Sequence, residues 1–86
     1  MKHAGSGALD TIEPVLEDLR RLTQIREKKR GIFYRGSSAF LHFHEDPAGI
    51  FADVRESAAW TRVPVNSASH GKLLMKLVRK ALRGRG

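Results

Sequence analysis

The sequence predicts a compact α+β domain with an N-terminal helix, a three- to four-stranded antiparallel meander and a C-terminal helix. Both helices are expected on one face of the sheet. Two observations lead to this class: apolar residues recur at helical spacing near each end of the chain, and they alternate with polar residues between 32 and 65. Residues 1–9 are expected to be a flexible tail, so that residues 10–84 form a single domain.

The N-terminal helix is predicted to begin at Asp10 and to end near Leu22 or Thr23. Asp10 is placed to cap the helix, and Glu13 three residues later completes a capping box. Pro14 then falls in the first turn, where its missing N–H costs little. The apolar stripe consists of Ile12, Val15, Leu16, Leu19 and Leu22.

Short strands joined by tight turns are predicted between the two helices. Residues 23–30 fit a helix continuation, a loop or a first strand. The strands that follow are expected at 32–35, 39–44, 50–55 and 60–65. The turns between them are too short for a crossover, so neighbouring strands should be antiparallel. Pro64 restricts the last strand to a sheet edge or a strand end.

The C-terminal helix is expected after Asn66 and Ser67, which supply capping groups. Its apolar stripe consists of Leu74, Leu77, Val78 and Ala81. The chain is a basic protein with a net charge of +7, and residues 67–86 contribute 6 cations and no carboxylate. The excess charge therefore belongs to one cationic element.

The length and composition of the chain exclude several classes of protein. A chain of 86 residues is near the small end of what one core holds together, so its stability should be modest unless it oligomerises. The absence of cysteine excludes disulfides, thiolate metal ligands and a cysteine nucleophile. No apolar run approaches the roughly 18 residues of a membrane span. A cytoplasmic protein with no membrane partner is the expectation.

The stretch 40–46 is a strand-like alternation that carries two histidines and ends in two carboxylates. Successive side chains of a strand point to opposite faces, so Leu41 and Phe43 should face the core. His42 and His44, the histidine pair, should then share the other face.

The histidine pair admits two interpretations. Two histidines with this spacing are a common geometry for adjacent ligands of zinc or another transition metal. The third ligand would come from Glu45, Asp46 or Asp53, of which Asp53 faces the same way if the next strand pairs in the expected register. In the other interpretation the imidazoles are neutral residues on a wet sheet face.

Nucleic-acid binding is a second candidate. Phe33 and Phe51 are expected to share the face of the histidine pair with nearby arginines, and rings that stack on bases beside such cations are typical of single-strand recognition. The cationic helix would follow a phosphate backbone without sequence preference. The candidate residues are Arg35, Arg55, Arg62, Lys72, Lys76, Arg79, Lys80 and Arg83. The alternatives are a solvated face of mixed charge and a surface buried in a homodimer.

The sequence does not predict an enzyme, and it assigns no catalytic residue and no cofactor. No serine has the context of a nucleophile elbow, and no glycine-rich phosphate loop follows a strand. A domain of this size without an evident cleft is a poor catalytic scaffold.

About half of the chain resembles known bacterial sequences. The stretches 28–35 and 39–53 resemble a set of small bacterial proteins with no established activity. The run Phe-x-x-Gly at 33–36, followed by the His-x-His strand, a turn and a strand that ends in aspartate, is similar to the bacterial luciferase-associated domain family. The resemblance implies that His42, His44, Glu45 and Asp53 are the positions to test.

Three predictions of function follow. The leading one is a non-enzymatic binding or interaction module of a bacterial cytoplasm that self-associates through a sheet edge or an exposed face. The alternative is a nucleic-acid-binding protein that uses the basic C-terminal helix with help from Arg35, Arg55 and Arg62. The third is a metal or small-ligand site at the histidine pair.

Overall fold

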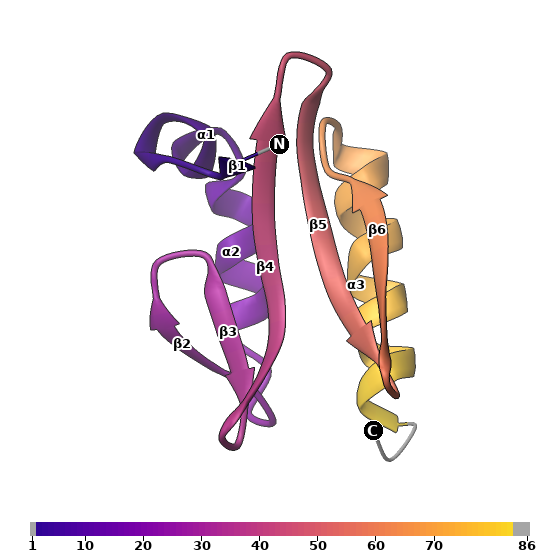
Figure 1. Ribbon diagram of the computed structural model, residues 1–86. Helices are drawn as coiled ribbons and strands as arrows, with labels where there is room; N and C mark the ends of the chain where they lie inside the picture. The colour runs from indigo at the N-terminus through magenta and orange to yellow at the C-terminus, as the bar shows by residue number, and fades with distance from the viewer. Residues whose placement is uncertain (1, 84–86) are drawn as a thin grey trace.

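The structure is a computed structural model that describes residues 2–83 (Figure 1). Three helices are present in this part of the chain: α1 (Ser6–Thr11), α2 (Glu13–Arg20) and α3 (Ala68–Arg83). The strands are β1 (Lys2–His3), β2 (Arg26–Lys29), β3 (Ile32–Arg35), β4 (Ser38–Asp46), β5 (Gly49–Glu56) and β6 (Ala59–Pro64).

The strands form one antiparallel sheet in the order β2-β3-β4-β5-β6, which is the order of the chain. The two longest strands, β4 and β5, lie at its centre, and their register places His42 opposite Asp53 and His44 opposite Phe51. Strand β1 pairs with the part of β4 that extends beyond β3, and this pairing places His3 opposite His44. The two ends of the chain thus meet different parts of one continuous meander (Figure 1).

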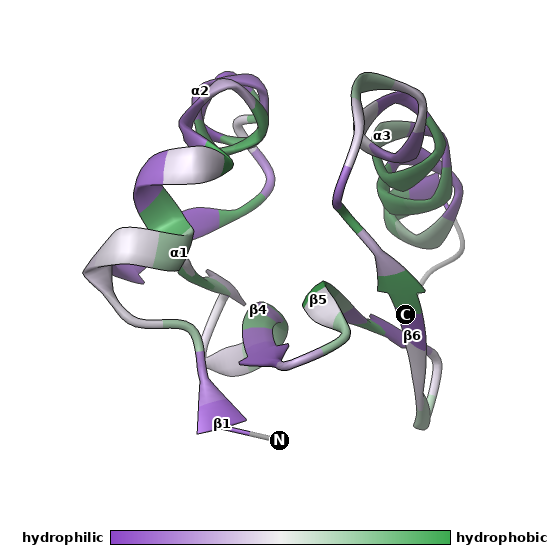
Figure 2. Ribbon diagram, turned by 90° about the horizontal axis from the view of Figure 1, so that it is seen from above, coloured by the Kyte–Doolittle hydropathy of each residue, from purple (hydrophilic) through white to green (hydrophobic). Residues whose placement is uncertain are grey.

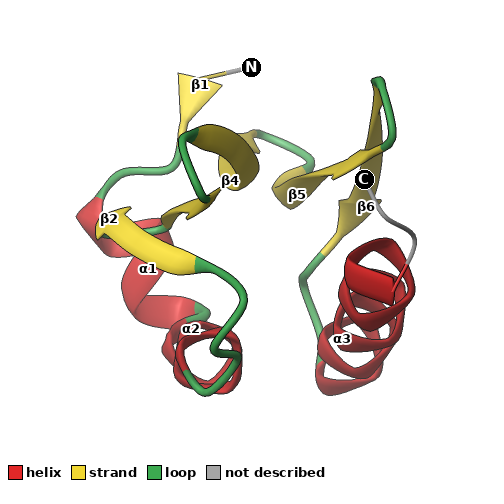
Figure 3. Cartoon of the chain, turned by 90° about the horizontal axis from the view of Figure 1, so that it is seen from below, coloured by secondary structure: helices red, strands yellow, loops and turns green. Residues whose placement is uncertain are grey.

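The helices lie on one face of the sheet and leave the other face uncovered (Figures 2 and 3). Their apolar sides turn toward the sheet, as Figure 2 shows by hydropathy. The largest fully buried side chains come from the helices and from the facing strands: Leu16, Leu19, Leu74, Val78, Phe33, Phe43, Leu41 and Val54. Within residues 2–83, none of the helices has the length and apolar composition needed to cross a bilayer.

The predicted α+β class with an antiparallel sheet is confirmed, but the prediction of two helices and three to four strands is too low. Strand β2 occupies part of the ambiguous segment 23–30. The tail expected over residues 1–9 contains β1 and the start of α1, whose Leu9 is buried. Met1 and Gly84, at the limits of the predicted tail and domain, lie outside the described residues.

The predicted capping box at Asp10 is wrong. Asp10 lies inside α1, and the chain breaks at Ile12 before α2 begins, with no side-chain cap on either helix. The carboxylates of Asp10 and Glu13 instead accept hydrogen bonds from Arg30, each at 2.8 Å. These two carboxylates therefore form ion pairs across the fold instead of capping a helix. Pro14 lies in the first turn of α2, as expected.

The start of α3 agrees with the sequence. Ser67 precedes the helix, and its hydroxyl oxygen accepts a hydrogen bond from the backbone N–H of His70 at 3.2 Å. This bond satisfies one of the free N–H groups that every helix has in its first turn.

Candidate metal-binding site

Three histidines converge on the uncovered side of the sheet. One ring nitrogen from each of His3, His42 and His44 lies within 4.8 Å of the other two. The ring centroids are 4.8 Å apart for His42 and His44, 4.9 Å for His3 and His44, and 5.7 Å for His3 and His42. Two of the three residues belong to β4 and the third to β1.

The strand geometry explains this convergence. Alternation along β4 buries Leu41 and Phe43 against the helices and directs the histidine pair to the other face. The N-terminal segment reaches the site because Ala4 N–H donates to the carbonyl of Phe43 at 3.0 Å. The backbone N–H of Gly5 also donates to Glu45 Oε2 at 2.6 Å.

The buried nitrogens of the histidine pair are free to bind a ligand. Nδ1 of His42 and Nδ1 of His44 are both buried and have no hydrogen-bond partner among residues 2–83. Burial, followed by the neighbouring His44, lowers the pKa of His42 below its usual 6.5. A neutral imidazole with an available lone pair is the form that coordinates metals.

A buried carboxylate adjoins the cluster. Asp53 is 6% exposed, and its Oδ2 lies 3.1 Å from Nε2 of His44. Arg62 donates to both carboxylate oxygens, at 2.7 Å and 2.8 Å, and this bidentate contact is the main reason why the pKa of Asp53 is lowered. Metal-bound histidines commonly have such a carboxylate behind them, which orients the ring.

The structure brings together only part of the predicted site. Asp53 lies beside His44, as the expected register requires. Glu45 is bound to the backbone of Gly5, and Asp46 accepts the N–H of Ala48 in the β4–β5 turn. Neither belongs to the group of converging ligand atoms, whose third member is a histidine rather than a carboxylate.

Sequence reasoning missed His3 as a member of the site. The residue lies in a two-residue strand, which is too short for any periodic signal, and it meets β4 through a pairing between residues about 40 positions apart. The only available signal was the presence of two further histidines, His3 and His70, outside the strand.

The arginines predicted to contact nucleic acid have partners inside the fold. Arg62 is bound to Asp53, Arg35 donates to the carbonyl of Leu82 at 3.0 Å, and Arg55 stacks over the ring of Trp60. The predicted cations of α3, by contrast, are all exposed.

The two phenylalanines expected on the outer face lie on different faces of the sheet. Phe33 pairs with Leu41 and is fully buried, so its predicted place beside the histidines is wrong. Phe51 pairs with His44 and takes the expected position. The register of β3 decides the face of Phe33, and a strand that alternates Ile, Phe, Tyr and Arg does not specify that register.

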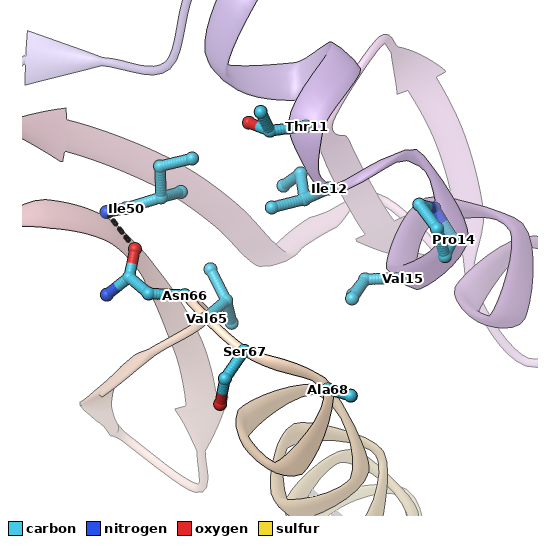
Figure 4. Close-up of a pocket in the computed structure, with 9 residues that line it drawn as sticks. All are labelled: Thr11, Ile12, Pro14, Val15, Ile50, Val65, Asn66, Ser67 and Ala68. Carbon is cyan, nitrogen blue, oxygen red and sulfur yellow. Dashed lines mark hydrogen bonds between the residues drawn. The ribbon is translucent and has the colours of Figure 1, made fainter.

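A cavity lies between the helices and the sheet, and no histidine lines it (Figure 4). Its volume is about 440 Å³, and it is lined by Thr11, Ile12, Pro14, Val15, Ile50, Val65, Asn66, Ser67 and Ala68. The Asn66 amide oxygen accepts the N–H of Ile50 at 2.7 Å and is therefore already engaged. The cavity has no titratable side chain in its lining, which leaves the histidine cluster as the site with chemistry.

The fold and the site define a small α+β domain with a three-histidine cluster on the open face of its sheet. No protein-family model, curated protein or solved structure matches the chain. The resemblance to small bacterial proteins and to the luciferase-associated domain family therefore stays a prediction.

Proposed function

We propose that the protein binds a divalent transition metal, with Zn²⁺ as the first candidate, through His3, His42 and His44. The observation that carries this proposal is the convergence of one ring nitrogen from each residue to within 4.8 Å. Three imidazoles without a thiolate form a donor set that suits zinc and its neighbours in the first transition series.

The unpaired nitrogens of the histidine pair support the proposal that a metal ion binds there. A buried polar atom without a partner costs about 1–3 kcal/mol, and most such atoms in folded proteins are paired. Here two of them, both Nδ1 atoms, belong to neighbouring rings of one cluster. A bound metal ion would satisfy both at once.

The geometry requires only small adjustments. Zinc binds imidazole nitrogen at about 2.0–2.1 Å, so two tetrahedral ligands lie about 3.3 Å apart. The present spread of up to 4.8 Å therefore has to close by about 1.5 Å. Side-chain rotation of the exposed His3 supplies a movement of this size. Three protein ligands leave a fourth position for water or for another ligand.

Calorimetric titration of the protein with Zn²⁺, without an affinity tag, tests the proposal. We expect one equivalent to bind, and we expect the variants His3→Gln, His42→Gln and His44→Gln each to weaken binding by more than about 100-fold, since loss of an outer partner alone costs 10- to 100-fold. His70→Gln is the matched control, because this fourth histidine lies at the start of α3 outside the cluster. Equal affinity in all four variants would contradict the proposal.

The single tryptophan provides a second readout. The ring centroid of Trp60 lies 4.8 Å from that of His42. Co²⁺ bound at the cluster should quench the tryptophan fluorescence and produce the visible absorption bands of a tetrahedral site, and excess Zn²⁺ should reverse both effects.

The prediction of a self-associating interaction module remains open, and sedimentation at two concentrations, with and without Zn²⁺, tests it.

A further inference from the structure

The exposed side of α3 carries a continuous cationic stripe, defined as Lys72, Lys76, Arg79, Lys80 and Arg83. These positions follow one another at spacings of 4, 3, 1 and 3 residues, so they fall within an arc of about 100° on a helix with 3.6 residues per turn. All five are exposed. The opposite side of the helix is buried in the core through Leu74, Met75 and Val78.

The charge of the stripe is not neutralised within the described part of the chain. None of its five cations forms an ion pair there, whereas Arg20, Arg21, Arg30 and Arg62 all do. An acidic residue of α2, Asp18, lines a shallow hollow together with Lys72 and Arg79. Its carboxylate is paired with Arg21 at 3.0 Å and contributes little net charge to the stripe.

The packing of α3 against the core decides which kind of polyanion the cationic stripe can bind. A helix that binds a membrane surface inserts its apolar side into the lipid. The apolar side of α3 is already occupied by the core, and among its residues only Leu73, 63% exposed, remains as a large apolar group in solvent. What the stripe offers is charge alone, over 12 residues or about 16 Å between the first and the last, enough to meet several phosphates of a nucleic acid.

We propose that the cationic stripe of α3 binds the phosphate backbone of nucleic acid without sequence preference. This proposal is independent of the metal site, because α3 lies on the helix-covered face of the sheet (Figure 2), whereas alternation along β4 directs the histidine pair to the other face. It also differs from a mode centred on the sheet arginines, since those side chains are engaged within the fold.

Fluorescence anisotropy with labelled duplexes of about 20 base pairs and random sequence tests the proposal. Three to five phosphate contacts predict that the logarithm of affinity falls with the logarithm of salt concentration with a slope of about −2.7 to −4.5. This slope corresponds to a loss of about 40- to 500-fold between about 50 and 200 mM salt. The variant Lys76→Gln/Lys80→Gln should weaken binding and make the slope shallower by about 2.

The control removes the same charge elsewhere. Arg26→Gln/Lys29→Gln changes two exposed cations of β2 and leaves the stripe intact, so the slope should keep its value. Circular dichroism of both variants checks that the fold is retained. The proposal is overturned if the two double variants lose equal affinity, if no duplex binds at low salt, or if vesicles rich in phosphatidylserine bind while the duplex does not.

Discussion

Asp53 is the residue on which the orientation of the proposed metal site depends. Its carboxylate is buried, lies next to His44 and is held by two hydrogen bonds from Arg62. An aspartate in this position does two things for a histidine ligand: it directs the ring, and it makes the coordinating nitrogen more basic.

We expect Asp53→Asn to lower the affinity for Zn²⁺ by about 10- to 100-fold, because asparagine keeps the shape of the side chain and loses its charge. Competition with a chromophoric chelator measures the change. Arg62→Gln should act in the same direction, since it releases the carboxylate that now faces His44. Unchanged affinity in both variants would show that the carboxylate has no part in the site.

Glu13 makes the stability of the N-terminal helices depend on pH. Hydrogen bonds from Arg30 and then Arg20 lower its pKa from 4.5 to about 2. A lowered pKa means that the ionised carboxylate stabilises the fold above about pH 4.5, and that this contribution is lost as the pH falls toward about 2. Urea unfolding between these pH values should show a smaller decline in Glu13→Gln than in the unchanged protein. Glu17→Gln, which removes a more distant partner of Arg20, should keep the decline.

At the scale of elements, the β4–β5 turn sets the register that places Asp53 near the histidines. Gly49 has a φ of +132°, and a Cβ added there would lie 2.7–2.9 Å from the side-chain amide of Asn66. That amide oxygen accepts the backbone N–H of Ile50 and so holds the second residue of β5. The turn thus has two reasons to require glycine, one conformational and one steric.

Gly49→Ala should lower the free energy of unfolding by about 2–3 kcal/mol, since a strained φ and a displaced Asn66 add together. Gly36→Ala is the matched control: its φ is also positive, at +64°, but an added Cβ meets nothing within 4 Å. It should cost only about 1 kcal/mol. Urea denaturation gives both values, and equal losses would show that the Asn66 contact contributes nothing.

The elements differ in how far the sequence predicts them. Alternation and turn residues identify β3 to β6, and helical spacing identifies α3 and the apolar positions of α2. Strand β1 and helix α1 escape prediction because short, glycine- and serine-containing segments acquire their structure from contacts with β4 and the core. The helix break at Ile12 also escapes prediction, because the carboxylates of Asp10 and Glu13, which fit a capping box in the sequence, pair with the distant Arg30 instead.

At the scale of the molecule, the stability of the fold depends on the packing of α3 against the sheet. Leu74 is fully buried, while its neighbour Leu73 is 63% exposed. Leu74→Ala should lower the free energy of unfolding by about 2–5 kcal/mol, and Leu73→Ala by less than about 0.5 kcal/mol. Thermal unfolding by circular dichroism measures both. Similar losses would mean that the helix packs through a different face.

The site as a whole is less predictable than the fold. The alternation of β4 correctly assigns the histidine pair to the outer face. The sequence leaves the register of β5 open, and the structure sets it so that Asp53 lies opposite His42 and next to His44. The third histidine depends on a non-local pairing, and no local pattern encodes which short segment will fill the edge of β4 beyond β3.

The pairing of β1 with β4 has a consequence for the unfolded chain. A metal held by His3 and His44 would act as a removable cross-link that closes a loop of about 40 residues in a protein with no cysteine. A permanent link around such a loop removes chain entropy and raises the free energy of the unfolded state by about 4 kcal/mol in the chain-entropy model. For a domain of this size that is a large share of the total stability, so the supply of metal would set how long the chain stays folded.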